Sequence, residues 1–464
     1  MATKQVFVVH AHFYQPPRGN PFSPESLAEP TAAPFKNWNE RIAAECYTPN
    51  AEAGNLPLIS FNLGETLAQW LESHVPETYQ AFLAADAQNA SDGLGNALAQ
   101  PMHHTILPAS RPEDQQTQVA WGIRAFEHRF GRKPTGMWLP EMAVDLPVLQ
   151  VLRRNGIEWT ILSGAQIVGD LPDGGPYWVD LPDGERIKVF VRDDALSNSV
   201  SFELNKFGGA GKWARTMLIP RRRTAGELTL LALDGETFGH HWPGEHEFLH
   251  WLLTYEAHSA GYEVTTLSRY LQDCQPTQTI EIKENSAWSS DYGLGRWVTG
   301  SADTEGESYW KGGLRRALDI LRGDLDYAYQ RVALEAGVAD PIALREAYID
   351  VILGSTDADK FLKAQDVSVK GDQAKALSKL IEAQFYRQRM FVSCAFYFTH
   401  LHSLEPRYAI ANAAYAIQLT KQATGLDFGP TFRKDLTFAR VEDEETGTVS
   451  TAATIYDDVL VDMP

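Results

Sequence analysis

Short apolar runs that end in polar residues recur through the first half of the chain. Most of them lack polar alternation, which is typical of strands buried on both faces of a parallel sheet. Helical patterns or loops lie between them, so the order of elements predicts a closed or nearly closed parallel barrel, with a doubly wound open sheet as the alternative. The predicted strands span residues 6–9, 58–62, 102–108, 134–139, 159–163, 187–191 and 228–233.

Helices and irregular segments are expected between these strands. Amphipathic periodicity indicates helices over about 64–74 and 115–130. An Asp-Gly pair marks the turn of a hairpin within 177–186. Residues 18–57 are rich in Pro, Asn and Glu and carry little periodicity, which predicts a long loop. Long loops in compact domains are more often functional than idle.

The pattern changes at about residue 280, where long helical periodicities replace the short runs. A chain of 464 residues is too long for one ordinary core. We therefore expect a barrel domain over 1–275 and a mainly helical domain over 276–464. The Ser-, Gly- and Trp-rich stretch 285–306 suggests that the helical domain packs on the rim where the barrel strands end. Helical patterns cover 310–333, 341–353, 372–390 and 408–422, and a hairpin is expected within 432–461, around Glu444-Glu445-Thr446-Gly447.

The composition of the chain limits the kinds of partner that it is expected to bind and the compartment in which it is expected to work. The formal charge is 41 − 60 = −19, which argues against a broad surface for nucleic acid or anionic membranes and suits a neutral substrate. Three widely spaced cysteines suggest neither a disulfide framework nor a zinc cluster, so a reducing compartment is the simpler interpretation. The first residues lack the pattern of a signal peptide, and no stretch resembles a membrane span. We expect a cytoplasmic protein, and nothing in the pattern indicates its oligomeric state.

Two of the predicted strands end in a carboxylate beside aromatic residues. Residues 228–233 run into Asp234, Gly235 and Glu236, and residues 136–139 run through Pro140 into Glu141. Ligands gather beyond the carboxyl ends of barrel strands. Cleavage of a glycosidic bond needs one carboxylate against the anomeric carbon and one protonated carboxyl that delivers a proton to the leaving oxygen. Asp-Gly is also an ordinary turn signal. The neighbouring His240, His241 and Trp242 favour a site, since such polar groups are costly to bury, and Trp138 and Trp242 offer faces on which sugar rings can stack.

Histidines at strand ends leave a second hypothesis open. His10 and His12 follow the first predicted strand and point to the same side of an extended chain, while His103 and His104 lie in the third. Together with Asp234 they are able to surround a divalent ion, as in a metal-dependent polysaccharide deacetylase. His-x-His after a strand is weak evidence, and Glu141 has no place in a three-ligand site. For each histidine, a structural role as a hydrogen-bonded residue of the core or rim is about as probable as a contact to a sugar.

The ordered motifs resemble glycoside hydrolase family 57. The segment 10–16, with His12 and Gln15, is similar to the family's first motif, and 103–108 to an intervening one. Trp138-Leu139-Pro140-Glu141 resembles the motif that carries the nucleophile, and 234–242 the motif that carries the general acid/base. Residues from about 280 onward resemble a helical domain of unknown function found in one branch of the family, with Ser286-Ala287-Trp288-Ser289 and Gly295-Arg296-Trp297 as the matching pieces.

The resemblance implies a (β/α)7 barrel and a retaining mechanism, with Glu141 as nucleophile, Asp234 as general acid/base, and no metal or cofactor. It also implies activity on an α-linked glucan or oligosaccharide, of the amylase, branching-enzyme or glucanotransferase type. A catalytically silent carbohydrate-binding barrel is a further alternative, but neither Glu141 nor Asp234 is replaced. The expected substrate contacts are His10, His12, Gln15, His103, His104, Trp138, Glu236, His240, His241 and Trp242.

Overall fold

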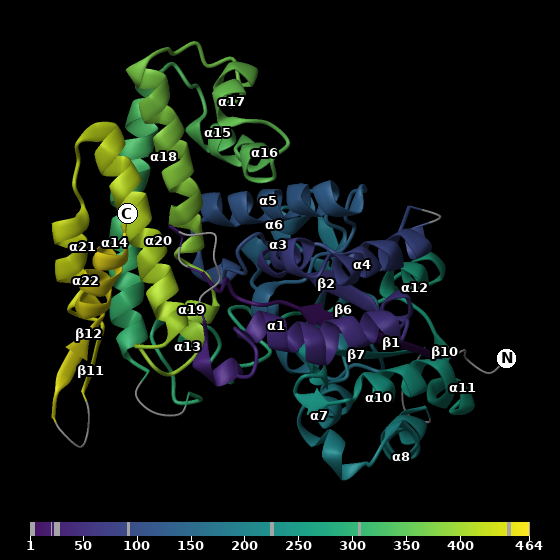
Figure 1. Ribbon diagram of the computed structural model, residues 1–464. Helices are drawn as coiled ribbons and strands as arrows, with labels where there is room; N and C mark the ends of the chain where they lie inside the picture. The colour runs from purple at the N-terminus through teal and green to yellow at the C-terminus, as the bar shows by residue number, and fades with distance from the viewer. Residues whose placement is uncertain are drawn as a thin grey trace. The chain divides into compact units, whose positions relative to one another are not determined.

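The computed structural model describes residues 5–19, 21–22, 28–90, 93–222, 227–304, 308–442 and 447–463 (Figure 1). Its contacts divide the chain into two compact units. The first comprises Met1–Gln15, Ala28–Pro101 and Phe126–Trp288. The second comprises Pro16–Leu27, Met102–Ala125 and Ser289–Pro464. Helix α5 (Pro112–Phe130) crosses this division, because its residues through Ala125 belong to the second unit.

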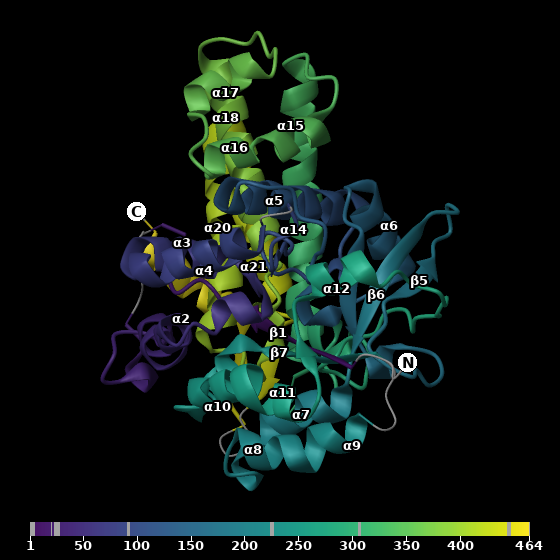
Figure 2. The ribbon, with the colours of Figure 1, turned by 90° about the vertical axis from the view of Figure 1, so that its right-hand side faces the viewer.

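The centre of the first unit is strand β1 (Val6–Phe13), whose eight residues are all buried. One edge of β1 pairs in parallel with β7 (Leu228–Asp234), and the other pairs with β2 (Ser60–Leu63). Strands β1 and β7 lie side by side in both views (Figures 1 and 2). Strand β3 (Ala97–Leu98) continues the sheet from β2. The apolar run 228–233 is buried throughout, as a strand covered on both faces requires.

The remaining parallel segments close the barrel. Isolated bridges join Ala99 to Met137 and Gly136 to Trp159, which is the first residue of β4 (Trp159–Ser163). Strand β4 pairs with β6 (Arg186–Arg192), and the N–H of Asp193 donates to the carbonyl of Leu230 in β7 at 2.8 Å. Seven parallel segments of the described chain therefore form a (β/α)7 barrel. Strand β5 (Tyr177–Asp180) makes the predicted antiparallel hairpin with β6.

Helices between the strands bury apolar faces on the barrel. In α6 (Leu146–Arg154), Val148, Leu149 and Leu152 are fully buried, and the Asp145 carboxylate caps the helix by accepting the N–H of Val148 at 2.8 Å. The other helices of this unit are α1 (Trp38–Ile42), α2 (Thr48–Glu52), α3 (Glu65–His74), α4 (Pro76–Asn89), α7 (Asp194–Glu203), α8 (Ala210–Trp213), α9 (Ile219–Arg221), α10 (His246–Trp251), α11 (Ala257–Ser259) and α12 (Leu267–Asp273). Short strands β8 (Phe238–Gly239), β9 (Trp242–Pro243) and β10 (Glu263–Val264) complete it.

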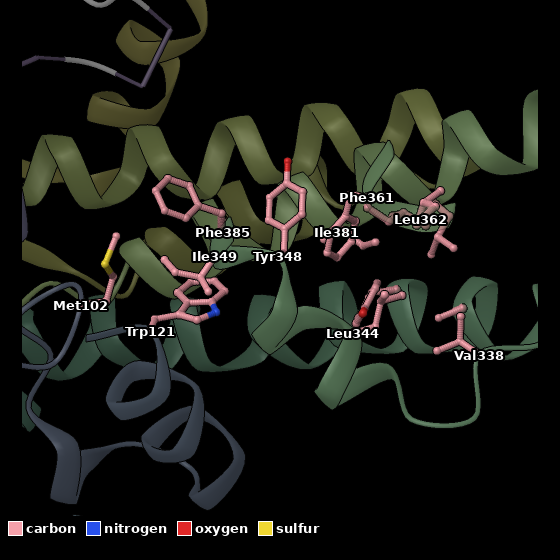
Figure 3. Close-up of a cluster of buried hydrophobic side chains, with 14 of the residues drawn as sticks. Met102, Trp121, Val338, Leu344, Tyr348, Ile349, Phe361, Leu362, Ile381 and Phe385 are labelled. Carbon is pink, nitrogen blue, oxygen red and sulfur yellow. The ribbon is translucent and has the colours of Figure 1, made fainter. Parts of the chain in front are cut away.

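The second unit is built on three long helices that contact one another, α14 (Trp310–Glu335), α18 (Asp372–Arg389) and α20 (Leu404–Thr424). A cluster of buried side chains joins α18 to Trp121 and Ala125 of α5 and to the shorter helices; Figure 3 shows Trp121, Tyr348 and Phe385 in it. The shorter elements are α13 (Gly295–Val298), α15 (Pro341–Ala347), α16 (Ile349–Ile352), α17 (Ala358–Ala364), α19 (Cys394–Tyr397), α21 (Gly429–Leu436), α22 (Ala452–Asp462), and the antiparallel pair β11 (Arg440–Glu442) and β12 (Val449–Thr451).

Two predicted strands of the barrel are not regular strands. The third strand is β3, at 97–98, whereas the predicted segment 102–108 forms turns in the second unit. Its apolar residues are buried among helices instead of in a sheet; Met102, for example, belongs to the cluster around Trp121. The predicted segment 134–139 contributes only the two isolated bridges.

The N-terminal loop and the C-terminal tail also differ from the prediction. The predicted loop 18–57 contains α1 and α2, joined by a π-helical turn at Ala43–Tyr47; Asn37 caps α1 by accepting the N–H of Glu40 at 3.0 Å. The tail forms the expected hairpin, but α21 and α22 flank it, and residues 444–446 of its predicted turn lie outside the described ranges. The expected domain boundary at 275 stays a prediction. No helix in the described ranges is long and apolar enough to cross a membrane.

Candidate active site

Asp234 is the last residue of β7 and lies in register with His12 of β1. The chain then turns sharply through Gly235 to Thr237, close against β1. A β-carbon on Gly235 would lie 2.2 Å from the ring of Phe13, so only glycine permits this approach. The turn brings the Asp234 carboxyl group to the edge of the barrel beside the side chains that β1 presents.

The surroundings of Asp234 hold a proton on its carboxyl group. Burial is the first cause, followed by the negative charges of Glu236 and Glu141, while Arg192 acts in the opposite direction. Together they raise the pKa of Asp234 to about 8. Asp234 is therefore protonated at neutral pH, and Glu141 is close enough to it for their charges to repel.

Glu141 is held by an unusual backbone and by Trp288. It lies in the turn Pro140–Met142 with φ 57° and ψ 19°, a left-handed backbone conformation that residues other than glycine rarely adopt. Two hydrogen bonds of 3.1 Å fix it there: the indole N–H of Trp288 donates to Oε2, and the backbone N–H of Trp288 donates to the Glu141 carbonyl. Such strained positions are concentrated at functional sites. The turn thus presents one carboxylate oxygen to a fixed donor.

Neutral rings surround Trp138. The imidazoles of His10 and His12 both stack on the Trp138 indole, with ring centroids 4.8 Å apart in each pair. Nε2 of His10 lies 3.1 Å from Oδ1 of Asn62, and the amide nitrogen of Asn62 lies 2.9 Å from Nδ1 of His12. Burial lowers the pKa of His10 to about 3 and that of His12 to about 4. The two histidines are therefore uncharged at neutral pH, and both are buried, as is Trp138, so the three rings pack against one another below the surface.

Glu236 and Gln15 are brought together by the approach of the Gly235 turn to the end of β1. Oε1 of Glu236 accepts the hydroxyl of Tyr47 at 2.5 Å, the side-chain amide of Gln15 at 3.4 Å and the backbone N–H of Tyr14 at 3.3 Å. Burial raises the pKa of Glu236 to about 7, although these donors act against it. Glu236 is therefore a second carboxyl group near Asp234 whose charge changes close to neutral pH.

The other three predicted contacts after Glu236 are His240, His241 and Trp242. Nδ1 of His240 donates to Oε2 of Glu45, 2.6 Å away, and the indole N–H of Trp242 donates to the carbonyl of Val200 at 3.1 Å. Nδ1 of His241 lies 3.5 Å from the Thr237 hydroxyl, and His241 is exposed.

His103 and His104 belong to the second unit. His103 packs edge-on against Trp121 and Phe385, and Nδ1 of His104 lies 2.6 Å from the Ser393 hydroxyl. Their assignment as substrate contacts stays a prediction.

Arg192 and Trp288 also lie beside the predicted carboxylates, although no motif assigned them a role there. Arg192 ends β6; its guanidinium lies 4.9 Å from the centre of the Trp288 ring and donates to the carbonyl of Ala232 at 2.9 Å. The signal was available, because Arg192 follows a buried apolar strand directly, as Asp234 does. Among the described residues, no three His, Cys, Asp or Glu side chains gather as ligands for a metal ion. Of the five ligands in the deacetylase hypothesis, His103 and His104 lie in the second unit and the others in the first.

Comparison with known proteins identifies the family of the chain. Residues 27–283 match the sequence profile of glycosyl hydrolase family 57. The chain belongs to this family. Residues 307–463 match a domain of unknown function, DUF3536. An α-amylase of Pyrococcus horikoshii is 23% identical over 245 residues, which are 50% of this chain and 37% of that protein. A 4-α-glucanotransferase of Thermococcus litoralis is 23% identical over 248 residues, 50% of this chain and 36% of that protein. The chain thus spans well under half the length of these curated relatives.

Solved structures share the fold. An exo-type maltose-forming amylase from Pyrococcus sp. ST04 superposes with a TM-score of 0.76 at 15% identity, covering 93% of this chain and 82% of that one. A GH57-type branching enzyme from Pyrococcus horikoshii gives a TM-score of 0.63 at 14% identity, covering 95% of both chains. At these identities the likeness shows the fold alone, and it confirms the barrel and the helical region predicted from the sequence.

Proposed function

We propose that this chain is a retaining glycoside hydrolase or transglycosylase that acts on an α-linked glucan or oligosaccharide through Glu141 and Asp234. The observation that carries the proposal is the different state of the two carboxyl groups. Burial and neighbouring negative charges raise the pKa of Asp234 to about 8, and an indole N–H donates to the Glu141 carboxylate. The family supports the same chemistry, since its named relatives are α-amylases and a 4-α-glucanotransferase, among others.

The first half of the reaction breaks the glycosidic bond. Asp234 protonates the leaving oxygen while Glu141 attacks the anomeric carbon from the opposite face and forms a covalent glycosyl-enzyme. We expect the two carboxyl groups to stand about 5–5.5 Å apart, as retention requires. Trp138 is fully buried against His10, His12 and Trp288, so we expect it to hold these side chains in place and not to stack on the sugar.

The second half restores the enzyme. Once Glu141 is esterified its negative charge is gone, and one cause of the raised pKa of Asp234 disappears. Asp234, which has given its proton to the leaving oxygen, therefore stays ionised and accepts a proton from water or from a sugar hydroxyl, which attacks the anomeric carbon. Two successive inversions give net retention. Water as acceptor gives hydrolysis and a sugar hydroxyl gives transfer.

The cellular setting and partners follow from composition. The formal charge of −19 opposes nucleic acid as a partner, and Cys46, Cys274 and Cys394 are free thiols. We accordingly extend the proposal to a cytoplasmic enzyme whose partner is a neutral carbohydrate.

A screen of α-glucans and maltooligosaccharides with NMR analysis of the first-formed anomer tests the proposal. We expect α-anomeric products from the unaltered chain and none from Glu141→Ala. A chelated sample run beside them should keep full activity. Stoichiometric zinc with activity lost on chelation would instead support a metal-dependent deacetylase, and no product from any α-glucan would support a silent binding protein.

A further inference from the structure

The backbone on both sides of Glu236 is held by the helical segment that precedes β2. Sγ of Cys46 donates to the carbonyl of Gly235 at 3.4 Å. The side-chain amide of Asn50 donates to the carbonyl of Phe238 at 2.7 Å. Cys46 belongs to the π-helical turn between α1 and α2, and π-helical turns occur frequently at functional sites. The side chain of Glu236 therefore starts from a backbone that is fixed in place.

Tyr47, the last residue of the same π-helical turn, contacts the Glu236 side chain directly. Its hydroxyl donates to Oε1 of Glu236 at 2.5 Å. The backbone N–H of Tyr14 and the side-chain amide of Gln15 donate to the same oxygen at 3.3 and 3.4 Å. The bond from Tyr47 is the shortest of the three, and its length is typical of a hydroxyl that donates to an ionised carboxylate. The geometry therefore suits a charged Glu236 with Tyr47 as its closest donor.

Both members of this pair are shielded from water. Tyr47 has no exposed surface, and Glu236 is 4% exposed. A buried carboxylate keeps its charge only where donors of the protein replace those that water would supply. Burial raises the pKa of Glu236 to about 7, and the bond from Tyr47 is the largest of the effects that lower it. Burial and the charge of Glu236 raise the pKa of Tyr47 well above its usual value, so the hydroxyl keeps the proton that it donates.

The charge of Glu236 acts on Asp234, two residues away. After burial, it is the largest cause of the raised pKa of Asp234, ahead of the charge of Glu141, while Arg192 acts in the opposite direction. The other titratable groups on the elements packed around the two carboxyl groups are His12, Glu45, Cys46 and His240. Tyr47 is thus linked to Asp234 through one charge, which lies on Glu236.

We propose that Tyr47 is a positioning residue, whose hydroxyl keeps the Glu236 carboxylate charged beside Asp234, so that Asp234 holds its proton for the leaving oxygen. The inference rests on the proposed function, to which the acid role of Asp234 belongs. Without the hydroxyl, Glu236 takes up a proton at higher pH and is neutral at neutral pH. Asp234 then loses its proton more readily, because the neighbouring negative charge is gone.

The pH dependence of kcat/KM on starch, whose leaving oxygen needs a proton, tests this role. We expect Tyr47→Phe to move the alkaline limb toward neutral pH by about 0.5–1 pH unit, and no further than Glu236→Gln moves it. In a Glu236→Gln background the same substitution should leave the limb in place, because no charge remains there for the hydroxyl to stabilise. Tyr177→Phe is the matched control, since it removes a buried hydroxyl that donates to the Asp173 carboxylate at 2.8 Å, and it should not move the limb.

A readout that needs no substrate separates this inference from the proposed function. The infrared carboxyl band that Glu236→Gln removes reports the protonation of Glu236 in the full chain. Its midpoint should lie at higher pH in Tyr47→Phe than in the unaltered chain. If the chain cleaves no α-glucan and this midpoint still moves, the proposed function alone is overturned. A midpoint that stays in place overturns the role of Tyr47, whether or not the chain cleaves an α-glucan.

Two kinetic results would also overturn the role of Tyr47. One is an alkaline limb that Tyr47→Phe does not move, and the other is a limb that moves equally in the Glu236→Gln background. In either case the tyrosine does not act through the charge of Glu236. If Tyr47→Phe does not fold, as judged by its melting temperature, Gln15→Met carries the same test. It removes another donor to Oε1 of Glu236 and should move the limb and the midpoint in the same directions by smaller amounts.

Discussion

Glu141 and Asp234 carry the same functional group at two strand ends of one barrel, but they are held by different means. Glu141 lies in a left-handed turn, and its carboxylate receives an indole N–H from Trp288. Asp234 ends a regular seven-residue strand with φ −61° and ψ 129°, an ordinary extended backbone. Burial and two neighbouring carboxylates raise its pKa to about 8. A donor stabilises negative charge at the first site, and enclosure disfavours it at the second.

The difference indicates that the surroundings of the two carboxyl groups, and not the groups themselves, decide which is suited to act as nucleophile and which as general acid/base. The donor to Glu141 comes from a segment 147 residues further along the chain. The proton on Asp234 depends in part on Glu236, which Tyr47 holds in place across 189 residues. Substitution of either carboxylate should abolish its own role, whereas substitution of a partner should change only how far the two roles differ.

Removal of Glu141 should have the largest effect. Glu141→Ala eliminates the atom that attacks the anomeric carbon, so kcat on both starch and an aryl maltoside should fall by about 10⁴-fold or more. Added azide should restore turnover on the aryl maltoside and give a product of inverted configuration, because azide replaces the attacking carboxylate. Turnover near normal on either substrate would mean that another residue is the nucleophile.

Removal of Asp234 should have a large but selective effect. Asp234→Ala takes away the proton donor, so kcat on starch should fall by about 10²–10⁴-fold. An aryl oxide leaves with little protonation, so the first step on an aryl maltoside should survive and glycosyl-enzyme should accumulate, visible as a burst of released phenol. Azide should then speed turnover with retention. Equal losses on the two substrates would contradict the assignment of Asp234 as acid.

The pH dependence should report the proton on Asp234. The group acts as an acid only while protonated, so kcat/KM should be retained below about pH 8 and lost as the pH rises through that value. Glu236→Gln removes the second-largest cause of the raised pKa of Asp234, and the alkaline limb should therefore move toward neutral pH. Glu45→Gln, which alters the neighbouring bond to His240, is the control. An alkaline limb that stays in place in Glu236→Gln would show that burial alone sets the pKa of Asp234.

Several parts of the fold could be predicted because they obey local rules. The run 228–233 is apolar except for Thr229 and is buried within β7, and the hairpin of β5 and β6 is marked by its Asp-Gly turn. The long helices of the second unit follow their amphipathic periods. Strand β3 has only two residues, so it carries no pattern to detect. The segment 102–108 looks like a strand because burial in a helical core and burial in a sheet select the same apolar residues.

The candidate site was predictable to the extent that it lies at strand ends. His10, His12, Asp234 and Glu236 were identified in this way, and the structure brings them together through the pairing of β1 with β7. The partners that set their properties are distant in sequence and have no local signal. Tyr47 belongs to a segment that was expected to be a loop, and Trp288 could not be distinguished from a packing residue. The left-handed backbone of Glu141 depends on tertiary contacts that no motif describes.

The smallest expected effect concerns the donor to Glu141. Trp288→Phe removes the indole N–H and keeps an aromatic ring beside Trp138 and Arg192, which lie 5.3 and 4.9 Å from the centre of the Trp288 ring. A hydrogen bond to a charged group contributes about 1.5–3 kcal/mol, and only part of it differs between ground and transition states, so kcat should fall about tenfold with little change in KM. Trp213→Phe, which removes an indole donor to Ser199 elsewhere in the barrel, is the matched control and should leave kcat unchanged. If the two variants lose activity equally, the Trp288 indole only packs, and the stabilisation of charge at Glu141 must come from elsewhere.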